Sequence, residues 1–276
     1  HKAMPVIYLM LAFHAALLAP RTYWLEPAGA LLAVLLAAGV YGAIRSLLGS
    51  IGRSREAAGR IVAIEHPSND VTTVRCQLER GWRGHQAGQF AFVTFEDREG
   101  AHPFTIASAN HGDSTVTFQI KALGDYTGAL AQRLHPGQTV RVEGPYGRFD
   151  LQRRNPKARQ IWIAGGIGVT PFLAWLESLQ AQPDQALAAE LHYCTRDQDG
   201  DAFVPRLQAL CADLPGIALH IHGARQGATL KAAALHGEHP SEIWFCGPSG
   251  LANALREGLR ALGARPRFYQ EAFELR

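Results

Sequence analysis

Hydrophobic and polar residues alternate differently in three successive parts of the chain. In the first part, residues 4–20 and 28–44 carry no formal charge, and each is at the lower limit of length for a helix that crosses a bilayer. The second segment can extend to Leu48 if Arg45 reaches the interface with its long side chain. The pattern therefore predicts two transmembrane helices in residues 1–50.

Basic residues gather after the second apolar segment: Arg45, Arg53, Arg55 and Arg60. Cytoplasmic flanks of membrane helices are enriched in Lys and Arg. We therefore expect the chain from residue 50 onward to lie in the cytoplasm, with the two helices in a bacterial inner membrane.

Residues 59–144 change to short, β-branched runs separated by Gly, Pro, Asn and Asp. Tyr126–Leu134 is amphipathic and predicts one helix. Six runs predict strands: Arg60–Glu65, Thr72–Glu79, Phe90–Phe95, Phe104–Ala107, Thr115–Lys121 and Thr139–Val142. Six short strands with one helix predict a small antiparallel barrel, which we assign to residues 55–153.

Residues 157–276 return to alternating strands and helices. The predicted strands are Gln160–Ala164, Ala188–Cys194, Ile217–His222, Glu242–Cys246 and Arg267–Phe273. This order predicts a doubly wound α/β domain with a parallel sheet, whose ligands bind at the carboxyl ends of the strands.

Composition adds several exclusions. The chain is 47% hydrophobic and has a net charge of +3, but its basic residues are scattered and not interleaved with aromatic residues, which argues against a nucleic-acid partner. Its 4 cysteines are far apart with no C-x-x-C pair, which argues against an iron–sulfur cluster or a zinc knuckle. Reduced thiols in a cytosolic domain fit best.

His14 lies within the first apolar segment, where ionisable residues are costly and usually functional. It could donate a hydrogen bond to a neighbouring helix, or it could bind haem iron through its neutral imidazole. His1 lies 13 residues earlier, about 20 Å along a helix, a separation suited to two stacked haems. Thirteen residues rotate an ideal helix by about 220°, so the two rings would share a face only if the helix bends, for instance near Pro5.

Three motifs of the predicted barrel carry polar groups: His102-Pro-Phe-Thr-Ile-Ala-Ser108, Ile120-Lys-Ala-Leu-Gly-Asp-Tyr-Thr127 and Gly144-Pro-Tyr-Gly-Arg-Phe149. Each alone could be a strand followed by a turn. Together and in this order they resemble the flavin-binding half of the ferredoxin-reductase superfamily. His-Pro-Phe-Thr resembles its ferric reductase and NADPH oxidase branch.

The resemblance implies a Greek-key barrel that binds FAD. The Thr105 hydroxyl and backbone amides would bond the flavin ring edge, and His102 would face the ribityl or phosphate region. Tyr126 and Thr127 begin a helix whose N-terminal amides suit the FAD pyrophosphate. The implied flavin residues are His102, Pro103, Phe104, Thr105, Ser108, Lys121, Gly124, Tyr126 and Thr127.

The first strand of the predicted sheet leads into Ile161-Trp-Ile-Ala-Gly-Gly-Ile-Gly-Val-Thr-Pro-Phe172, a glycine turn followed by a helix. Pro171 is well placed in the first helical turn. This turn and Cys246-Gly-Pro248 resemble the nucleotide-binding half of the same superfamily. The implied NADPH residues are Gly165, Gly166, Gly168, Thr170, Pro171, Gly247 and Pro248, with Cys246 beside the nicotinamide. An inert buried thiol is the alternative for Cys246.

Arg196 and Arg225 follow the second and third predicted strands of the sheet. Either could pair with the 2′-phosphate of NADPH or lie in a surface ion pair. The last residues, 268–276, resemble the family's terminal Glu-x-aromatic motif, which implies catalytic roles for Glu271 and for Phe273 as the ring that covers the flavin. Tyr269 is the alternative to Phe273.

The resemblance covers almost the whole chain and implies the C-terminal part of a membrane ferric reductase or NADPH oxidase-like flavocytochrome. Electrons would pass from NADPH through FAD to haem b, bound in part by His1 and His14, and then to a ferric chelate, to dioxygen or to a periplasmic or extracellular protein. Two alternatives remain open. One is a membrane-tethered reductase that serves a separate protein, and the other is an electron-relay subunit without its own acceptor turnover.

Overall fold

The computed structural model describes residues 3–79, 81–96, 98–182, 187–237 and 239–271. The chain forms two compact units, His1–Arg55 and Glu56–Arg276. Of the sequence-predicted site residues, His1 and Phe273 lie outside the described residues.

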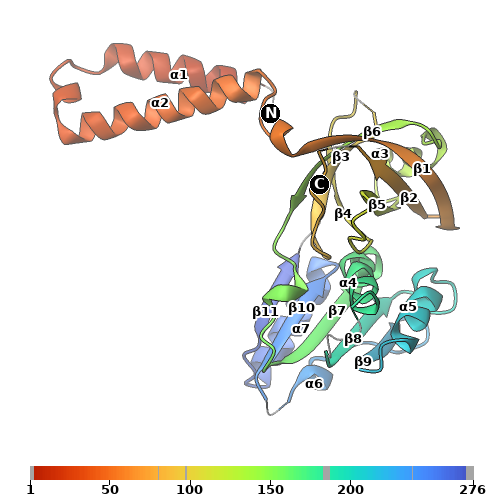
Figure 1. The fold of residues 1–276 in the computed structure, drawn as a ribbon. Helices are drawn as coiled ribbons and strands as arrows, with labels where there is room; N and C mark the ends of the chain where they lie inside the picture. The colour runs from red at the N-terminus through yellow and green to blue at the C-terminus, as the bar shows by residue number, and fades with distance from the viewer. Residues whose placement is uncertain (1–2, 80, 97, 183–186, 238, 272–276) are drawn as a thin grey trace. The chain divides into compact units, whose positions relative to one another are not determined.

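The N-terminal unit is a pair of apolar helices, α1 (Met4–Leu18) and α2 (Pro27–Leu47), joined through the short 3-10 turn η1 (Tyr23–Leu25) (Figure 1). At 1.5 Å per residue, the 21 residues of α2 reach about 31 Å, close to the thickness of a bilayer core. The 15 residues of α1 reach only about 22 Å. Of the described helices, α2 alone has the length and composition to cross a membrane, so only one of the two predicted spans is matched.

Large apolar side chains of this unit are exposed, among them Met10, Phe13, Leu18 and Val34. The two helices touch where the Tyr8 ring lies against Gly39, and the Tyr8 hydroxyl donates to the Leu36 carbonyl at 3.5 Å. A helix pair with so little buried apolar surface gains little stability from packing against itself in water.

The barrel has six antiparallel strands, as the sequence predicts. They are β1 (Glu56–Ser68), β2 (Val71–Leu78), β3 (Phe90–Thr94), β4 (His102–Thr105), β5 (Thr115–Lys121) and β6 (Thr139–Tyr146), in the order β4-β3-β6-β1-β2-β5. The two edges meet where Ile106 pairs with Phe118 and the Ala107 amide donates to the Thr117 carbonyl at 2.8 Å. The predicted helix is α3 (Asp125–Arg133), between β5 and β6.

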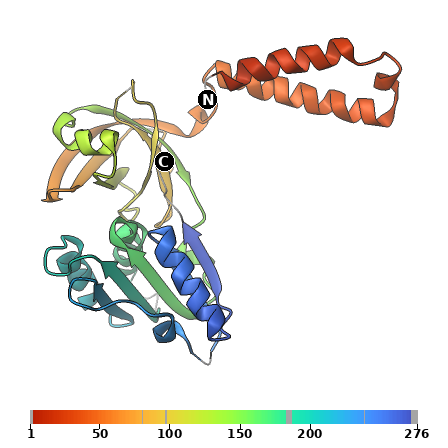
Figure 2. The ribbon, with the colours of Figure 1, turned by 180° about the vertical axis from the view of Figure 1, so that it is seen from behind.

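The second half of this unit is a five-stranded parallel sheet in the order β11-β10-β7-β8-β9, which confirms the doubly wound α/β prediction. Its strands are β7 (Arg159–Gly165), β8 (Ala189–Thr195), β9 (Ile217–Gly223), β10 (Ser241–Cys246) and β11 (Arg267–Glu271). Helices α4 (Thr170–Gln180) and α5 (Phe203–Ala212) cover one face, and α6 (Ala232–Leu235) and α7 (Ser249–Ala261) lie on the other, as Figures 1 and 2 show from opposite sides.

Aromatic side chains join the barrel to the sheet. Phe149, which follows β6, stacks on Trp175 of α4 with ring centroids 4.9 Å apart, and it meets Trp244 of β10 edge-on at 5.3 Å. The indole nitrogen of Trp175 donates to the Ala87 carbonyl of the barrel at 2.9 Å. Gly88 has φ +94°, and a Cβ there would collide with the Phe149 carbonyl, so only glycine allows this close approach.

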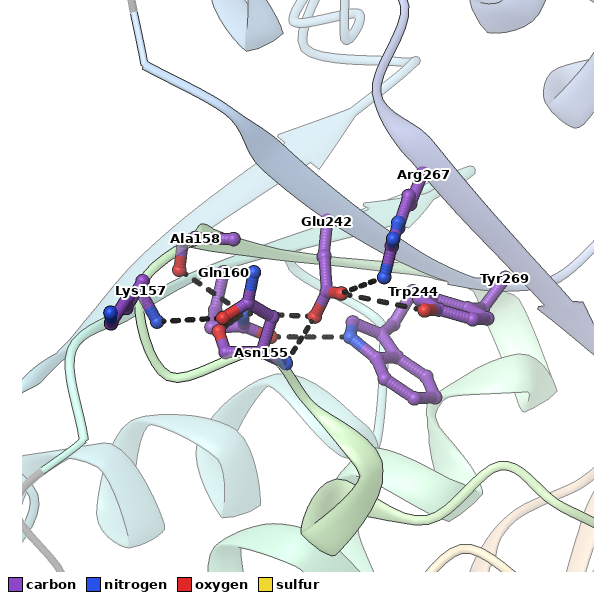
Figure 3. Close-up of polar contacts among 8 residues, drawn as sticks. All are labelled: Asn155, Lys157, Ala158, Gln160, Glu242, Trp244, Arg267 and Tyr269. Carbon is purple, nitrogen blue, oxygen red and sulfur yellow. Dashed lines mark hydrogen bonds and ion pairs between the residues drawn. The ribbon is translucent and has the colours of Figure 1, made fainter.

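A buried carboxylate fastens the connection between the two halves at the amino end of the sheet (Figure 3). Glu242 is 1% exposed and accepts hydrogen bonds from the Asn155 amide at 2.8 Å and the Gln160 side-chain nitrogen at 3.2 Å. Its second oxygen faces the Tyr269 hydroxyl at 3.4 Å and Arg267 at 3.9 Å. A buried charge requires such partners. The network ties the connecting loop to β7, β10 and β11.

Candidate functional site

A cleft of about 990 Å³ lies where the barrel meets the carboxyl end of the parallel sheet. It brings together residues from both predicted sites. From the barrel come Pro103, Phe104, Thr105, Lys121 and Thr127, and from the sheet come Gly165, Gly166, Gly168, Thr170, Arg196, Cys246, Gly247 and Pro248. Residues as far apart in the sequence as Ser68 and Leu251 therefore line one cavity.

The barrel wall of the cleft carries a prearranged charge. The Lys121 ammonium lies 3.3 Å from the Asp70 carboxylate, which also accepts a hydrogen bond from the Ser68 hydroxyl at 2.8 Å. The Ser68 hydrogen bond and then Lys121 lower the pKa of Asp70. Ser68 and Asp70 line the cleft but were missed by the sequence analysis. A Ser-x-Asp turn beside an alternating strand was the available signal.

The N-terminus of α3 opens beside this wall. The Thr127 hydroxyl accepts hydrogen bonds from the Leu123 and Gly124 amides, at 3.0 and 3.2 Å, and so fixes the turn that begins the helix. Thr127 lines the cleft, whereas Gly124 acts as the helix cap. The remaining amides of the first turn give this end a partial positive charge, which suits an anionic group.

His102 and Tyr126 form a stack, with ring centroids 4.0 Å apart, and neither is among the residues that line the cleft. Their interior atoms, the His102 Nε2 and the Tyr126 hydroxyl, have no hydrogen-bond partner among the described residues. Burial raises the pKa of Tyr126 to about 12, so the hydroxyl keeps its proton. Buried polar groups are normally hydrogen-bonded. The two unpartnered atoms therefore fit a site in which a bound ligand supplies hydrogen-bonding groups next to Pro103.

Ser108 is not among the residues that line the cleft. Its hydroxyl accepts a hydrogen bond from the Thr117 amide at 3.1 Å, and its carbonyl bonds the His85 ring at 2.9 Å. The chain turns inward after β4 to close the barrel against β5, and that turn takes Ser108 into the interior. It serves barrel closure.

Two glycine turns form the sheet side of the cleft. A Cβ on Gly168 would collide with the Cys246 carbonyl, and one on Gly165 would collide with the Pro248 ring. Gly166 has φ +54°, a conformation that glycine adopts at little cost. The glycines are therefore needed so that the turn after β7 can touch the turn after β10. Pro171 is buried in the first turn of α4 and supports this arrangement from behind, outside the cleft lining.

Cys246 lines the cleft and is 2% exposed. Burial, and secondarily the charge of Glu271, raise the pKa of its thiol. The sulfur is therefore protonated near neutral pH and is not an activated nucleophile. A protonated thiol agrees both with a position beside the nicotinamide and with an inert buried cysteine. The place of Cys246 in the cleft lining favours the position beside the nicotinamide.

Glu271 pairs with Cys246 in the register of β10 and β11 and is not among the residues that line the cleft. One of its oxygens is buried without a hydrogen-bond partner among the described residues. Burial raises the pKa of the carboxyl to about 7. Glu271 can thus exchange a proton near neutral pH, next to the Cys246 wall.

The far end of the cleft is organised by Asp201, a residue that the sequence analysis missed. Its carboxylate accepts hydrogen bonds from the Tyr193 hydroxyl at 2.8 Å, the Thr195 hydroxyl at 2.5 Å and the Phe203 amide at 2.8 Å. An Asp two residues before a helix start was the signal in the sequence. It holds the end of β8 against the start of α5.

The two predicted phosphate-binding arginines differ in their surroundings. Arg196 is exposed, lines the cleft and makes no ion pair with the residues that the structure describes. Arg225 lies outside the lining and bonds the Asp197 carboxylate at 2.6 Å. Gln226 and then Arg225 lower the pKa of Asp197, so the pair stays ionised. Of the two, Arg196 is available to a ligand.

Comparison with known proteins bears directly on the barrel. Residues 57–150 match the family model of an FAD-binding domain. The barrel is therefore similar in sequence to known FAD-binding domains. The matched residues include every barrel residue that lines the cleft.

Relatives and solved structures extend the likeness beyond the FAD-binding domain. An NADPH oxidoreductase of Mycobacterium tuberculosis is 27% identical over 80% of this chain and 60% of its own length. The reductase component of the naphthalene 1,2-dioxygenase system of Pseudomonas putida is 25% identical over 78% of this chain and 68% of its own. The chain spans about half the length of other reductases that it matches.

The fold of the whole second unit is also known. A ferredoxin NADP+ reductase from Neisseria gonorrhoeae, solved with bound FAD and NADP, matches with a TM-score of 0.63 at 18% identity, over 79% of this chain and 98% of its own. The FAD-binding domain and the parallel sheet therefore have the two-part fold of ferredoxin-NADP reductases.

Glu271 should make stability depend on pH. Its folded pKa of about 7 lies above the ordinary value of 4.5, so its contribution to stability is full below about pH 4.5 and is lost as the pH rises through 7. We expect urea unfolding of the full chain to show that the free energy of unfolding of wild type falls between pH 5 and pH 8. The fall should exceed that of Glu271→Gln by up to about 3 kcal/mol. Glu257→Gln is the control for loss of an exposed carboxylate. A constant difference between wild type and Glu271→Gln across this range would contradict the assignment.

Proposed function

We propose that this chain is an FAD-dependent NAD(P)H reductase that passes electrons to a separate protein. The observation that carries the proposal is the single cleft in which the flavin-side residues of the barrel face the glycine turns of the sheet. The FAD-binding domain and the names of the relatives support the same chemistry. When bound, FAD accepts two electrons as hydride from the nicotinamide and can release them one at a time.

Residues of this chain supply binding and orientation. Lys121 and the N-terminus of α3 offer positive charge for the FAD pyrophosphate, and Pro103–Thr105 lines the wall along which the flavin would lie. The glycine turns let a nucleotide approach the backbone beside Cys246. Cys246 would supply a neutral contact for the nicotinamide, and Glu271, beside it on β11, can hold or release a proton near neutral pH.

A protein acceptor is favoured by the relatives. The naphthalene dioxygenase relative is named as the reductase component of a system, so its electrons go to a further component. We propose that this chain likewise passes electrons to a separate protein. This is the membrane-tethered reductase, one of the two alternatives left open by the sequence. Arg196 at the far end of the cleft favours NADPH as the donor.

The reductase proposal is tested with the full chain and added FAD. NADPH should bleach the flavin absorbance under anaerobic conditions, and the reduced protein should reduce cytochrome c as a surrogate acceptor. Gly168→Ala should retain FAD but lose at least about tenfold in flavin reduction rate, because its Cβ meets the Cys246 carbonyl. Gly250→Ala is the matched control, since nothing lies within 4 Å of its added Cβ.

Two results would contradict the proposal. A folded chain that takes up no FAD would remove the flavin assignment. A chain that binds FAD but is reduced by neither NADPH nor NADH would remove the reductase activity.

Arg196 should set the preference for NADPH. A guanidinium fits a phosphate, and a charged hydrogen bond contributes about 1.5–3 kcal/mol, so Arg196→Ala should lower kcat/KM for NADPH by roughly 10- to 100-fold and leave NADH nearly unchanged. Arg225→Ala should have a smaller effect, because Asp197 already holds that side chain. Equal losses with both nucleotides in Arg196→Ala would make this arginine structural.

A second candidate, the haem-linked ferric reductase or NADPH oxidase reading, is favoured by the N-terminal unit. The exposed apolar surface of α1 and α2 suits lipid, and we propose that α2 anchors the chain in a bacterial inner membrane with the cleft in the cytoplasm. His14 is exposed on α1. It is the one histidine among the described residues of this unit, so a haem held by two histidines needs a second ligand from elsewhere. Ferric chelate or dioxygen would then be acceptors beyond the haem.

Haem content separates the two candidates. If His14 binds iron, His14→Ala in the full chain should remove at least one haem per protein in a pyridine haemochrome assay, because a ligand of the iron is lost. Phe13→Ala, at the exposed neighbouring position, controls for disturbance of α1. Haem that is absent from wild type, or unchanged in His14→Ala, would leave the protein-acceptor reductase as the function.

A further inference from the structure

A cluster of histidines lies on the parallel sheet outside the cleft lining. His192 of β8 pairs in register with His220 of β9, and Glu190 and His222 are each two residues away along the same strands. Side chains alternate between the faces of a sheet, so these four share one face. It is the face opposite α4 and α5, because the alternate residues Leu191 and Tyr193 belong to the core beneath those helices.

Three of these side chains present metal-ligating atoms to a common point. The ligand atoms of Glu190, His192 and His220 all lie within 4.8 Å of one another. The His192 Nε2 is 3.7 Å from a Glu190 oxygen. His192 is 4% exposed, and its Nε2 is buried with no hydrogen-bond partner among the described residues. A buried, unpaired ring nitrogen is costly unless something binds it.

His222 sets the orientation of His192. The Nδ1 of His192 lies 3.1 Å from the Nε2 of His222. If Nδ1 carries the proton and donates it to His222, the Nε2 of His192 presents a lone pair toward Glu190 and His220. Metal-bound histidines commonly donate their other ring nitrogen in this way.

We propose that Glu190, His192 and His220 bind one divalent transition-metal cation of the zinc class. Two imidazoles and a carboxylate are a common ligand set for Zn²⁺, with bonds of about 2.0–2.2 Å and a fourth position for water. The exposed His220 ring is free to turn toward His192, on which it now stacks at 4.8 Å between centroids.

Arg159 influences the strength of this site. It makes two hydrogen bonds of 2.7 Å to Glu190, which fix the carboxylate and also place a positive charge beside it. The carboxylate therefore shares its charge between Arg159 and the cation, and we expect micromolar rather than nanomolar affinity. The cation would link the edge strand β9 to β8. Its ligand His192 lies three residues before Thr195, and His220 lies four residues before Ala224, whose amide donates to the Thr195 carbonyl at the cleft.

The test measures Zn²⁺ binding by the full chain after treatment with a chelator. Competition with a chromophoric chelator should give one site with micromolar Kd. His220→Gln, at an exposed position that tolerates substitution, should weaken that site by about 10- to 100-fold. His236→Gln, an exposed histidine of the same half of the unit, should not change it. Co²⁺ should give visible ligand-field absorption in wild type that is lost in Glu190→Gln.

The binding data decide the proposal directly. Loss of the site in His220→Gln and its retention in His236→Gln support the assignment. Absence of a micromolar site in wild type, or the same affinity in wild type and His220→Gln, would overturn it. None of these outcomes depends on flavin content or on nucleotide oxidation.

Discussion

The packing of the barrel against α4 is the interaction on which the candidate site depends. Phe149 stacks on Trp175, and the Trp175 indole bonds the Ala87 carbonyl, so one aromatic residue is shared by the two halves. Burying a large aromatic pair contributes several kcal/mol. The Glu177 carboxylate, bonded to the Ala109 amide and to Arg206, adds a polar contact at the same surface. Without this packing the flavin-side and nucleotide-side residues would not face one another.

Close backbone approach is the second requirement. Gly168 meets the Cys246 carbonyl, and Gly165 meets Pro248, at distances that no side chain would allow. These contacts bring the ends of β7 and β10 together at the carboxyl edge of the sheet, where ligands of such sheets bind. Cys246 and Glu271 are then buried in the same place, and this burial raises both pKa values. Burial alone raises the pKa of Glu271, whereas at Cys246 the charge of Glu271 adds to the effect of burial.

The two units differ in what stabilises them. In Glu56–Arg276 the large apolar side chains are buried in three clusters, two around the parallel sheet and one within the barrel. In His1–Arg55 the apolar side chains are mostly exposed. This contrast supports our proposal of a membrane anchor joined to a reductase. Haem has a part in the function only if the electron acceptor is reached through the membrane.

The sequence alone determined the elements and their chemistry. Alternation of apolar residues predicted all six barrel strands and the five strands of the sheet, because a buried face imposes its period on the chain. Glycines at 165, 166 and 168 were recognisable because a tight turn leaves few other choices. Only the tertiary structure decided which groups meet. It turned Ser108 inward, gave Arg225 to Asp197 and left Arg196 open to the cleft. Such pairings depend on contacts between residues far apart in the sequence. The local alternation of apolar and polar residues therefore does not predict them.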